Sequence, residues 1–162
     1  MMTLCCDVLN RLQGKTLVTA ESLTGGGIGA ALTAVSGSSG VYKGGIISYT
    51  NEVKYHILGV KTETLDQFGA VSSQPAAVMA AGVRQRLDAD VAVSVTGLAG
   101  PGGDDYGNPV GTVFIGYCDE YCLLTKECHF SGDRESVRNQ TIQAALNLVL
   151  ERNESKTSPK VL

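Results

Sequence analysis

Short apolar runs alternate with amphipathic segments along most of the chain. Apolar runs bounded by polar or glycine-rich residues predict buried strands, and apolar residues three or four positions apart predict helices. The strands expected on this basis are residues 16–20, 44–49, 90–96, 110–117 and 123–130. The helices expected are residues 3–13, 23–35, 51–58, 62–68, 73–88 and a last helix that begins after Ser131 or Asp133.

Alternating strands and helices favour an α/β fold with helices layered on a largely parallel sheet. The two strands after residue 110 are joined only by a short turn at Asp119 and Glu120. They should therefore pair as an antiparallel hairpin, which makes the sheet mixed. We expect a single domain over residues 1–151. Residues 152–162 are polar and without periodicity, and we expect them to form a disordered tail.

Two of the expected helices have an apolar face that should pack inward. On the helix over 73–88 this face comprises Val78, Ala81, Gly82 and Leu87. On the last helix it comprises Val137, Thr141, Ala144, Ala145, Leu148 and Val149.

Glycine is the one unusual residue count, with 20 in 162 residues, and it clusters at three places. These clusters follow or open the strands expected at 16–20, 44–49 and 90–96. In open α/β sheets, ligands bind beyond the carboxyl ends of the strands. We therefore look for the functional site where these three segments meet.

The first strand ends in Glu21-Ser22-Leu23-Thr24, followed by three glycines and a helical pattern. A hydroxyl at a helix N-terminus lies among unpaired N–H groups, so Ser22 suits either a helix cap or a nucleophile. Residues 25–30 also match the dinucleotide-binding pattern G-x-G-x-x-A. We reject this interpretation because four residues separate the strand from the first glycine.

Lys54 is the candidate base for Ser22. It falls in the first turn of the helix opened by Thr50 or Asn51, where the helix dipole and burial would both lower its pKa. The alternative is a solvated surface lysine. Tyr49 and Lys54 resemble the Tyr-x-x-x-Lys pair of short-chain dehydrogenases, but their spacing is five rather than four. Tyr49 is better placed as a pocket wall or as a hydroxyl that assists proton transfer.

The glycine-rich segment 97–109 is too long for an ordinary connection, and its N–H groups can turn toward an anion or an oxyanion. Thr96 adds a hydroxyl at its start. Arg134 and Arg138 lie one helical turn apart and can grip a phosphate, unless they are solvated arginines paired with nearby acids.

Composition and charge argue against several classes of binding partner. The net charge of -3 gives no basic surface for nucleic acid, and no apolar run is long enough to span a membrane. The first residues do not form a signal peptide, so we expect a cytoplasmic protein. Five cysteines without a C-x-x-C pair are expected to be reduced thiols, mostly in packing. With two histidines, we expect no metal and no cofactor.

A set of ordered motifs over about residues 5–150 resembles the CinA C-terminal family, the nicotinamide-nucleotide amidohydrolases. The matching segments are Ala20-Glu21-Ser22-x-Thr24-Gly25-Gly26, Gly37-Ser38-Ser39, Ser48-Tyr49-Thr50-Asn51-Glu52-x-Lys54, Gly69-Ala70-Val71-Ser72, Thr96-Gly97-x-Ala99-Gly100-Pro101, Pro109-Val110-Gly111-Thr112-Val113 and Phe130-x-Gly132-Asp133-Arg134. The family commonly has Cys where this chain has Leu23.

The resemblance implies a three-layer α/β/α sandwich with a mixed, mostly parallel sheet and one antiparallel hairpin, in the family's stand-alone form. It implies hydrolysis of nicotinamide mononucleotide to nicotinic acid mononucleotide and ammonia. The alternative is a non-catalytic nucleotide-binding paralogue with a regulatory role. We also expect a homo-oligomer.

The resemblance places the serine–lysine dyad on Ser22 and Lys54, with Tyr49 nearby. The residues expected to bind substrate are Thr24, Gly25, Gly26, Thr96, Gly97, Gly100, Arg134 and Arg138. The oxyanion is expected to be held by N–H groups of the turn over 24–27 or of the loop over 97–103.

Overall fold

A computed structural model describes residues 1–154 of the chain. Its elements are α1 (Met2–Arg11), β1 (Leu17–Glu21), α2 (Gly27–Thr33), η1 (Ser38–Gly40), β2 (Tyr42–Ile47), α3 (Asn51–Leu58), α4 (Thr62–Phe68), α5 (Ser73–Arg86), β3 (Val91–Gly97), β4 (Thr112–Cys118), β5 (Leu123–His129) and α6 (Arg134–Arg152).

The strands form one five-stranded sheet in the order β2-β1-β3-β4-β5. Strand β1 pairs in parallel with both β2 and β3. Strand β4 is antiparallel to β3 and to β5, so it alone runs against the other strands of the sheet. This mixed sheet with its antiparallel hairpin confirms the expected α/β fold.

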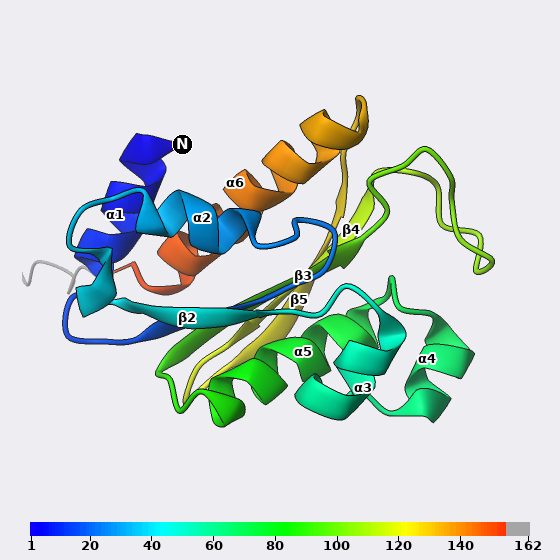
Figure 1. The fold of residues 1–162 in the computed structure, drawn as a ribbon, viewed down its shortest axis with the longest axis horizontal. Coiled ribbons are helices and arrows are strands. Elements are labelled where there is room, and N and C mark those ends of the chain that lie inside the picture. Colours follow the sequence, from blue (N-terminus) through cyan, green and yellow to red (C-terminus); the bar gives the residue numbers. More distant parts are fainter. Residues whose placement is uncertain (155–162) are drawn as a thin grey trace, which may run out of the picture.

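Helices cover both faces of the sheet, giving three layers (Figure 1). Helices α1, α2 and α6 pack on one face and enclose the larger apolar cluster of the protein. Helix α5 crosses the other face, with α3 and α4 beside it. Strands β1 and β3 lie between these layers and are buried along almost their whole length, which explains their continuous apolar sequence.

One expectation about the helices is wrong, and a second is confirmed only in part. Helix α2 begins at Gly27 rather than at residue 23, because the preceding residues form a turn in which Gly25 and Gly26 have positive φ. On α5 the fully buried residues are Pro75, Ala76, Met79, Ala80 and Val83, whereas Val78, Ala81 and Leu87 of the predicted face are only partly buried against the same apolar cluster. Alanine, valine and glycine occur all round this helix, so its apolar pattern does not distinguish one face from the other.

Helix α6 runs through Arg152, and the side chain of Asn153 donates hydrogen bonds to Tyr117 Oη (3.1 Å) and Val149 O (2.8 Å). The expected tail therefore does not begin at residue 152, and residues 155–162 lie outside the described part of the chain.

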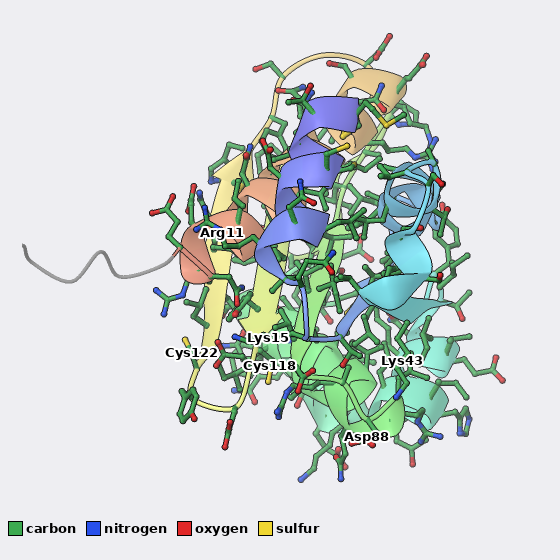
Figure 2. The ribbon with its side chains drawn as sticks, turned by 90° about the vertical axis from the view of Figure 1, so that its left-hand side faces the viewer. Arg11, Lys15, Lys43, Asp88, Cys118 and Cys122 are labelled. Carbon is green, nitrogen blue, oxygen red and sulfur yellow. The ribbon has the colours of Figure 1, made fainter. Side chains whose placement is uncertain are left out.

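Figure 2 shows the end of the sheet where the parallel strands begin. There Lys43 Nζ donates a hydrogen bond to Asp88 O (2.8 Å), which joins the start of β2 to the connection before β3. Cys118 and Cys122 lie near the β4–β5 turn but pack against different apolar clusters. All five cysteines are free thiols. Among the described residues, no helix combines the length and apolar character that a membrane span requires.

Candidate active site

The corner between β1 and α2 is organised by the carboxylate of Glu21, which is buried at the end of the strand. Its oxygens accept hydrogen bonds from the hydroxyls of Thr24 (2.6 Å) and Thr19 (3.3 Å) and from the N–H groups of Gly26 (3.1 Å), Ile28 (3.0 Å) and Gly29 (2.9 Å). Glu21 therefore takes the N-terminal donors of α2 that an external anion would otherwise use.

Ser22 follows directly, and its N–H donates a hydrogen bond to Val95 O (3.0 Å) on the neighbouring strand. Side chains alternate across a strand, so Glu21 faces α2 while Ser22 faces the layer that contains α3. Ser22 is 7% exposed. Since Glu21 caps α2, the helix-cap interpretation of Ser22 does not hold.

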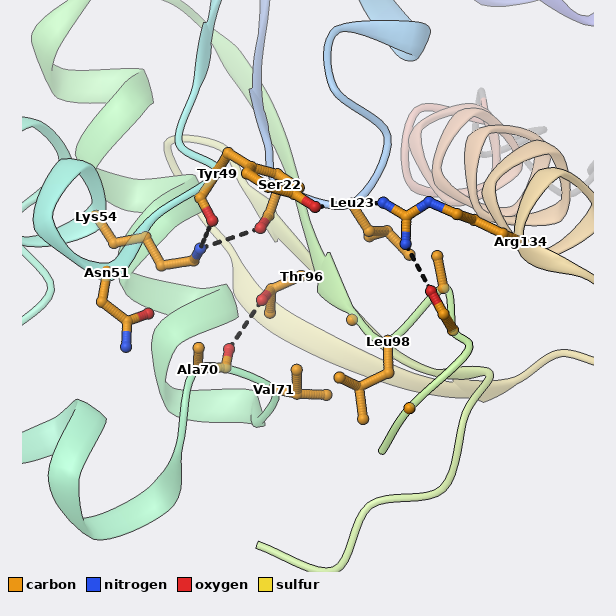
Figure 3. A pocket seen from close by; sticks show the side chains of 14 residues that line it. Ser22, Leu23, Tyr49, Asn51, Lys54, Ala70, Val71, Thr96, Leu98 and Arg134 are labelled. Atoms are coloured by element: carbon orange, nitrogen blue, oxygen red, sulfur yellow. Dashed lines mark hydrogen bonds between the residues drawn. The ribbon is translucent and has the colours of Figure 1, made fainter. Parts of the chain in front are cut away.

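Lys54 reaches Ser22 from the first turn of α3. This helix begins after Thr50, whose side chain accepts a hydrogen bond from Val53 N (3.4 Å). The Lys54 side chain is 2% exposed, and its Nζ lies 3.0 Å from Ser22 Oγ (Figure 3). Nζ also donates to the carbonyls of Ser48 (2.8 Å) and Tyr49 (3.4 Å). The contact expected between Ser22 and Lys54 is present.

Burial lowers the pKa of Lys54 from 10.5 to about 8, because the ammonium form loses hydration. The three neighbours of Nζ fit either protonation state. An ammonium can donate to all three oxygens, and a neutral amine can donate to the two carbonyls while accepting from the Ser22 hydroxyl. This is the environment that a general base needs.

The pair opens onto a cavity of about 340 Å³ beyond the carboxyl ends of β1 and β3. This volume lies in the lower part of the range of small-molecule sites, which starts at about 300 Å³. The lining residues are Ser22, Leu23, Tyr49, Asn51, Lys54, Ala70, Val71, Thr96, Gly97, Leu98, Ala99, Gly100, Gly102 and Arg134. The strand ends expected to converge do so here.

Tyr49 and Arg134 form one side of this cavity. Tyr49 is 60% exposed, and its hydroxyl accepts a hydrogen bond from Arg134 Nη2 (3.2 Å). Arg134 Nη1 donates to Gly100 O (2.7 Å), so the guanidinium links the β2–α3 corner to the glycine-rich loop. The Tyr49 hydroxyl is thus directed toward Arg134.

Three of the other expected binding residues line the cavity and four do not. Thr96, Gly97 and Gly100 lie in its wall. Thr96 Oγ1 donates to Ala70 O (2.8 Å), which holds the segment after α4 against β3.

The expectation is wrong for Thr24, Gly25 and Gly26, which lie on the α2 side of the corner and outside the cavity lining. The Thr24 hydroxyl and the Gly26 N–H bind Glu21, and the Gly25 N–H binds Ser22 O (3.1 Å). Their hydrogen-bonding groups are therefore used within the corner itself.

Arg138 also lies outside the cavity lining, contrary to expectation. Its guanidinium donates to Leu23 O (3.0 Å) and Thr24 O (3.1 Å) from α6. These two hydrogen bonds hold the turn that carries Ser22 against α6.

The oxyanion donors expected from the turn over 24–27 are largely engaged as well, because Gly27 N–H binds Thr24 O (3.0 Å). Within residues 1–154, the N–H groups of Leu23 and Thr24 have no hydrogen-bond acceptor. Leu23 follows Ser22 and lines the cavity.

Sequence reasoning did not assign a role to Glu21, although an acid directly before the serine and glycines was a signal for a helix cap. It also missed Leu23, Asn51, Ala70 and Val71 as lining residues. The side chains of Leu23, Ala70 and Val71 have no reactive group, so only the packing of the fold shows that they lie in the wall. Among residues 1–154, no cluster of three or more His, Cys, Asp or Glu side chains is arranged to hold a metal ion.

Comparison with known proteins identifies the family. The profile of the CinA C-terminal domain matches residues 3–153. The chain belongs to the CinA C-terminal domain family. The CinA-like protein of Rippkaea orientalis is 48% identical over 140 residues, which cover 85% of this chain and 34% of the relative. The chain spans about a third of the length of the curated CinA relatives that it matches.

Solved structures of this family share the fold over nearly their whole length. The competence/damage inducible protein CihA from Agrobacterium tumefaciens is 40% identical with a TM-score of 0.91, covering 94% of this chain and 95% of that chain. A competence-damaged protein (CinA) superfamily protein from Escherichia coli is 36% identical with a TM-score of 0.91, covering 93% of this chain and 89% of that chain.

Proposed function

We propose that the protein hydrolyses the carboxamide of nicotinamide mononucleotide to nicotinic acid mononucleotide and ammonia, with Ser22 as nucleophile and Lys54 as base. The observation that carries this proposal is the buried Ser22–Lys54 contact of 3.0 Å in the cavity lining. A serine hydroxyl is a weak nucleophile until a neighbouring base accepts its proton, and a lysine can do so once its pKa is lowered.

In the acylation step, Ser22 Oγ attacks the carboxamide carbon while its proton passes to neutral Lys54. The tetrahedral intermediate then collapses, the C–N bond breaks, and the Lys54 ammonium returns the proton to the leaving nitrogen. Ammonia departs, and the acyl group remains as an ester on Ser22. Tyr49 is 60% exposed with its hydroxyl bound to Arg134, so its role here is to form the cavity wall and orient that arginine.

In the deacylation step, a water molecule takes the place of the leaving ammonia. Lys54 accepts its proton as it attacks the ester carbonyl, and the bond to Ser22 Oγ breaks. The same proton restores the serine hydroxyl, and the product acid leaves, losing its remaining proton to the solvent to become a carboxylate. Lys54 thus serves as base and acid in both halves of the reaction.

The oxyanion needs N–H donors on the cavity side of Ser22. The Leu23 N–H fits this role because it follows the nucleophile, has no acceptor within residues 1–154, and belongs to a lining residue. A single donor of this kind contributes about 3–4 kcal/mol to transition-state stabilisation. Arg138 supports this donor by holding the carbonyl of Leu23.

Arg134 is the cationic group suited to the phosphate. Its guanidinium lies in the cavity wall and uses one N–H on each terminal nitrogen for Gly100 O and Tyr49 Oη. Arginine offers five N–H donors, so others remain for a phosphate. Thr96 and the glycines of the loop would contact the sugar.

The direct test is ammonia release from nicotinamide mononucleotide by the purified protein, with the acid product identified by chromatography. Calorimetry on the same preparation measures binding. Turnover supports the proposal. Binding without ammonia release would favour the non-catalytic nucleotide-binding alternative.

We expect Arg134→Gln to raise KM for nicotinamide mononucleotide by about 10- to 100-fold, since it removes a charge-assisted contact to the phosphate. Nicotinamide riboside, which lacks the phosphate, provides the comparison. Its kinetic constants should change little between wild type and variant. Equal losses for both compounds would argue against a phosphate contact by Arg134.

A further inference from the structure

The loop between β3 and β4 extends on the side of the molecule that carries α4 (Figure 1), and the Tyr106 side chain near its tip attaches it to the end of that helix. Tyr106 Oη donates its single proton to Asp66 O (2.8 Å), and Leu65 O lies 3.1 Å from the same hydroxyl. These carbonyls belong to the last turn of α4. The tyrosine is 50% exposed, so its ring lies on the surface of this helix end rather than in the core.

The tyrosine ring occupies space that only glycine leaves open. Gly69 has a φ of +75°, and a Cβ at this position would lie 2.6 Å from Cδ2 of Tyr106. The glycine that ends α4 therefore permits both the backbone turn and the close approach of the ring. Contact between the loop and the helix end is thus formed by the ring as well as the hydroxyl.

Neighbouring residues hold Tyr106 in this position. Asp104 Oδ1 accepts hydrogen bonds from the N–H groups of Tyr106 (3.0 Å) and Asn108 (2.9 Å). The Asn108 side chain donates to Asp104 Oδ2 (2.7 Å) and to Val71 O (3.2 Å). The loop tip is therefore ordered internally and makes a second attachment to the segment after α4.

The two segments joined in this way are two walls of the cavity. The near end of the loop supplies the lining residues from Gly97 to Gly102, and the segment after α4 supplies Ala70 and Val71. Neither Ser22 nor Lys54 takes part in these attachments. Loss of the anchor should therefore loosen the walls around a ligand and leave the reacting pair in place.

We propose that Tyr106 is a positioning residue that anchors the glycine-rich loop to the end of α4 and thereby sets the affinity of the cavity for its nucleotide. The inference rests on the proposed function for the identity of the ligand. The anchor itself rests only on the contacts of Tyr106 and Asn108.

The test uses Tyr106→Phe, which removes the hydroxyl, and Tyr106→Ala, which also removes the ring. Tyr121→Ala is the matched control because Tyr121 is 90% exposed on the β4–β5 turn. Each protein is assayed for kcat and KM with nicotinamide mononucleotide. Hydrogen exchange of the unliganded proteins then measures opening at the hydrogen-bonded amides of these two walls, Leu98 (to Thr112 O) and Gly69 (to Leu65 O).

We expect KM to rise about three- to tenfold in Tyr106→Phe, the effect of one lost hydrogen bond, and further in Tyr106→Ala. The kcat should stay within about twofold of wild type in both. Exchange should accelerate in the two wall segments, and Tyr121→Ala should behave as wild type. A KM that Tyr106→Ala leaves unchanged, or a loss confined to kcat, would overturn the inference.

The experiment also distinguishes an error in the proposed function from an error in the proposed anchor. Wild-type protein would then release no ammonia, and the exchange measurement alone would decide the anchor. Acceleration confined to the amides of Leu98 and Gly69 in Tyr106→Ala supports it. Unchanged exchange at these amides, or acceleration that extends equally to β1 and β3, overturns it.

Discussion

Three oxygen atoms surround the amine of Lys54, and none of them carries a full charge. They are Ser22 Oγ, Ser48 O and Tyr49 O, at 3.0, 2.8 and 3.4 Å. Dipoles of this kind compensate a buried ammonium less well than water or a carboxylate would. The result is a pKa lowered to about 8, so that a usable fraction of the amine is neutral at physiological pH although most of it is still charged.

The rate should therefore depend on pH through Lys54. The active form is the neutral amine, so kcat/KM should rise with pH and level off above the pKa of about 8. At pH 7 roughly a tenth of the amine is neutral by this pKa. Measurement of kcat/KM from about pH 6 to 9.5 checks the profile. A flat profile, or one that falls over this range, would exclude a lysine base.

Lys54→Met should abolish activity and stabilise the fold at pH 7. The folded-state pKa lies below the unfolded one, so at pH 7 both states are protonated and the folded state bears the full cost of the buried charge. Removing this cost should raise the free energy of unfolding by about 1–3 kcal/mol. The gain should shrink as pH rises through about 8 toward 10.5, where the native lysine is neutral when folded.

Urea unfolding at two pH values, one near 7 and one near 9.5, measures this difference. Lys43→Met is the control, because Lys43 is exposed and remote from the site. Lower stability of Lys54→Met at pH 7 would show that the charge is better compensated than these contacts indicate.

At this scale the sequence was sufficient to predict that Ser22 and Lys54 lie together, because they follow two strands whose carboxyl ends meet at one edge of the sheet. It was insufficient for Arg134 and Arg138, which share a helical spacing. The structure sends Arg134 into the cavity wall and Arg138 to the carbonyls of the turn. The carbonyl that each guanidinium contacts depends on the position of α6 relative to the β1–α2 corner. The local sequence pattern does not specify this position.

At the scale of elements, helix capping and the proposed nucleophile are assigned to two consecutive residues at the corner between β1 and α2. Glu21 caps the helix, and Ser22 faces the cavity. The alternation of side chains along a strand places consecutive residues on opposite faces, so the cap and the nucleophile do not compete. The same arrangement explains why the glycines of the turn do not touch the ligand space: their role is to let the backbone reach Glu21.

Helix α6 carries both arginines, and its start is fixed by Asp133. The Asp133 carboxylate accepts a hydrogen bond from Ser136 N (2.8 Å), which resolves the choice between Ser131 and Asp133 as the cap. Asp133→Ala should lower the free energy of unfolding by about 1 kcal/mol. Ser131→Ala, the matched control, should change it by less than about 0.5 kcal/mol. Thermal unfolding of both variants is the measurement, and equal losses would contradict this assignment of the cap.

At the scale of the whole molecule, the cavity is made by segments far apart in the sequence. The sequence correctly predicted that the segments after β1, β2 and β3 meet at one site. These strands are parallel, so their carboxyl ends lie at the same edge of the sheet. The segment at Ala70 and Val71 was not expected there. It reaches the cavity because α5 packs across β3 and β4, and the order of packing of helices on a sheet is set by the complete core.

The central claim is that Ser22 performs the chemistry, and the most direct test is ammonia release by Ser22→Ala compared with wild type. The substitution removes one oxygen from a turn held by Glu21 and Arg138, so the variant should fold and bind nicotinamide mononucleotide with wild-type affinity by calorimetry. We expect its ammonia release to fall to background. Release of ammonia by the variant at a rate near that of wild type would contradict the assignment of Ser22 as nucleophile.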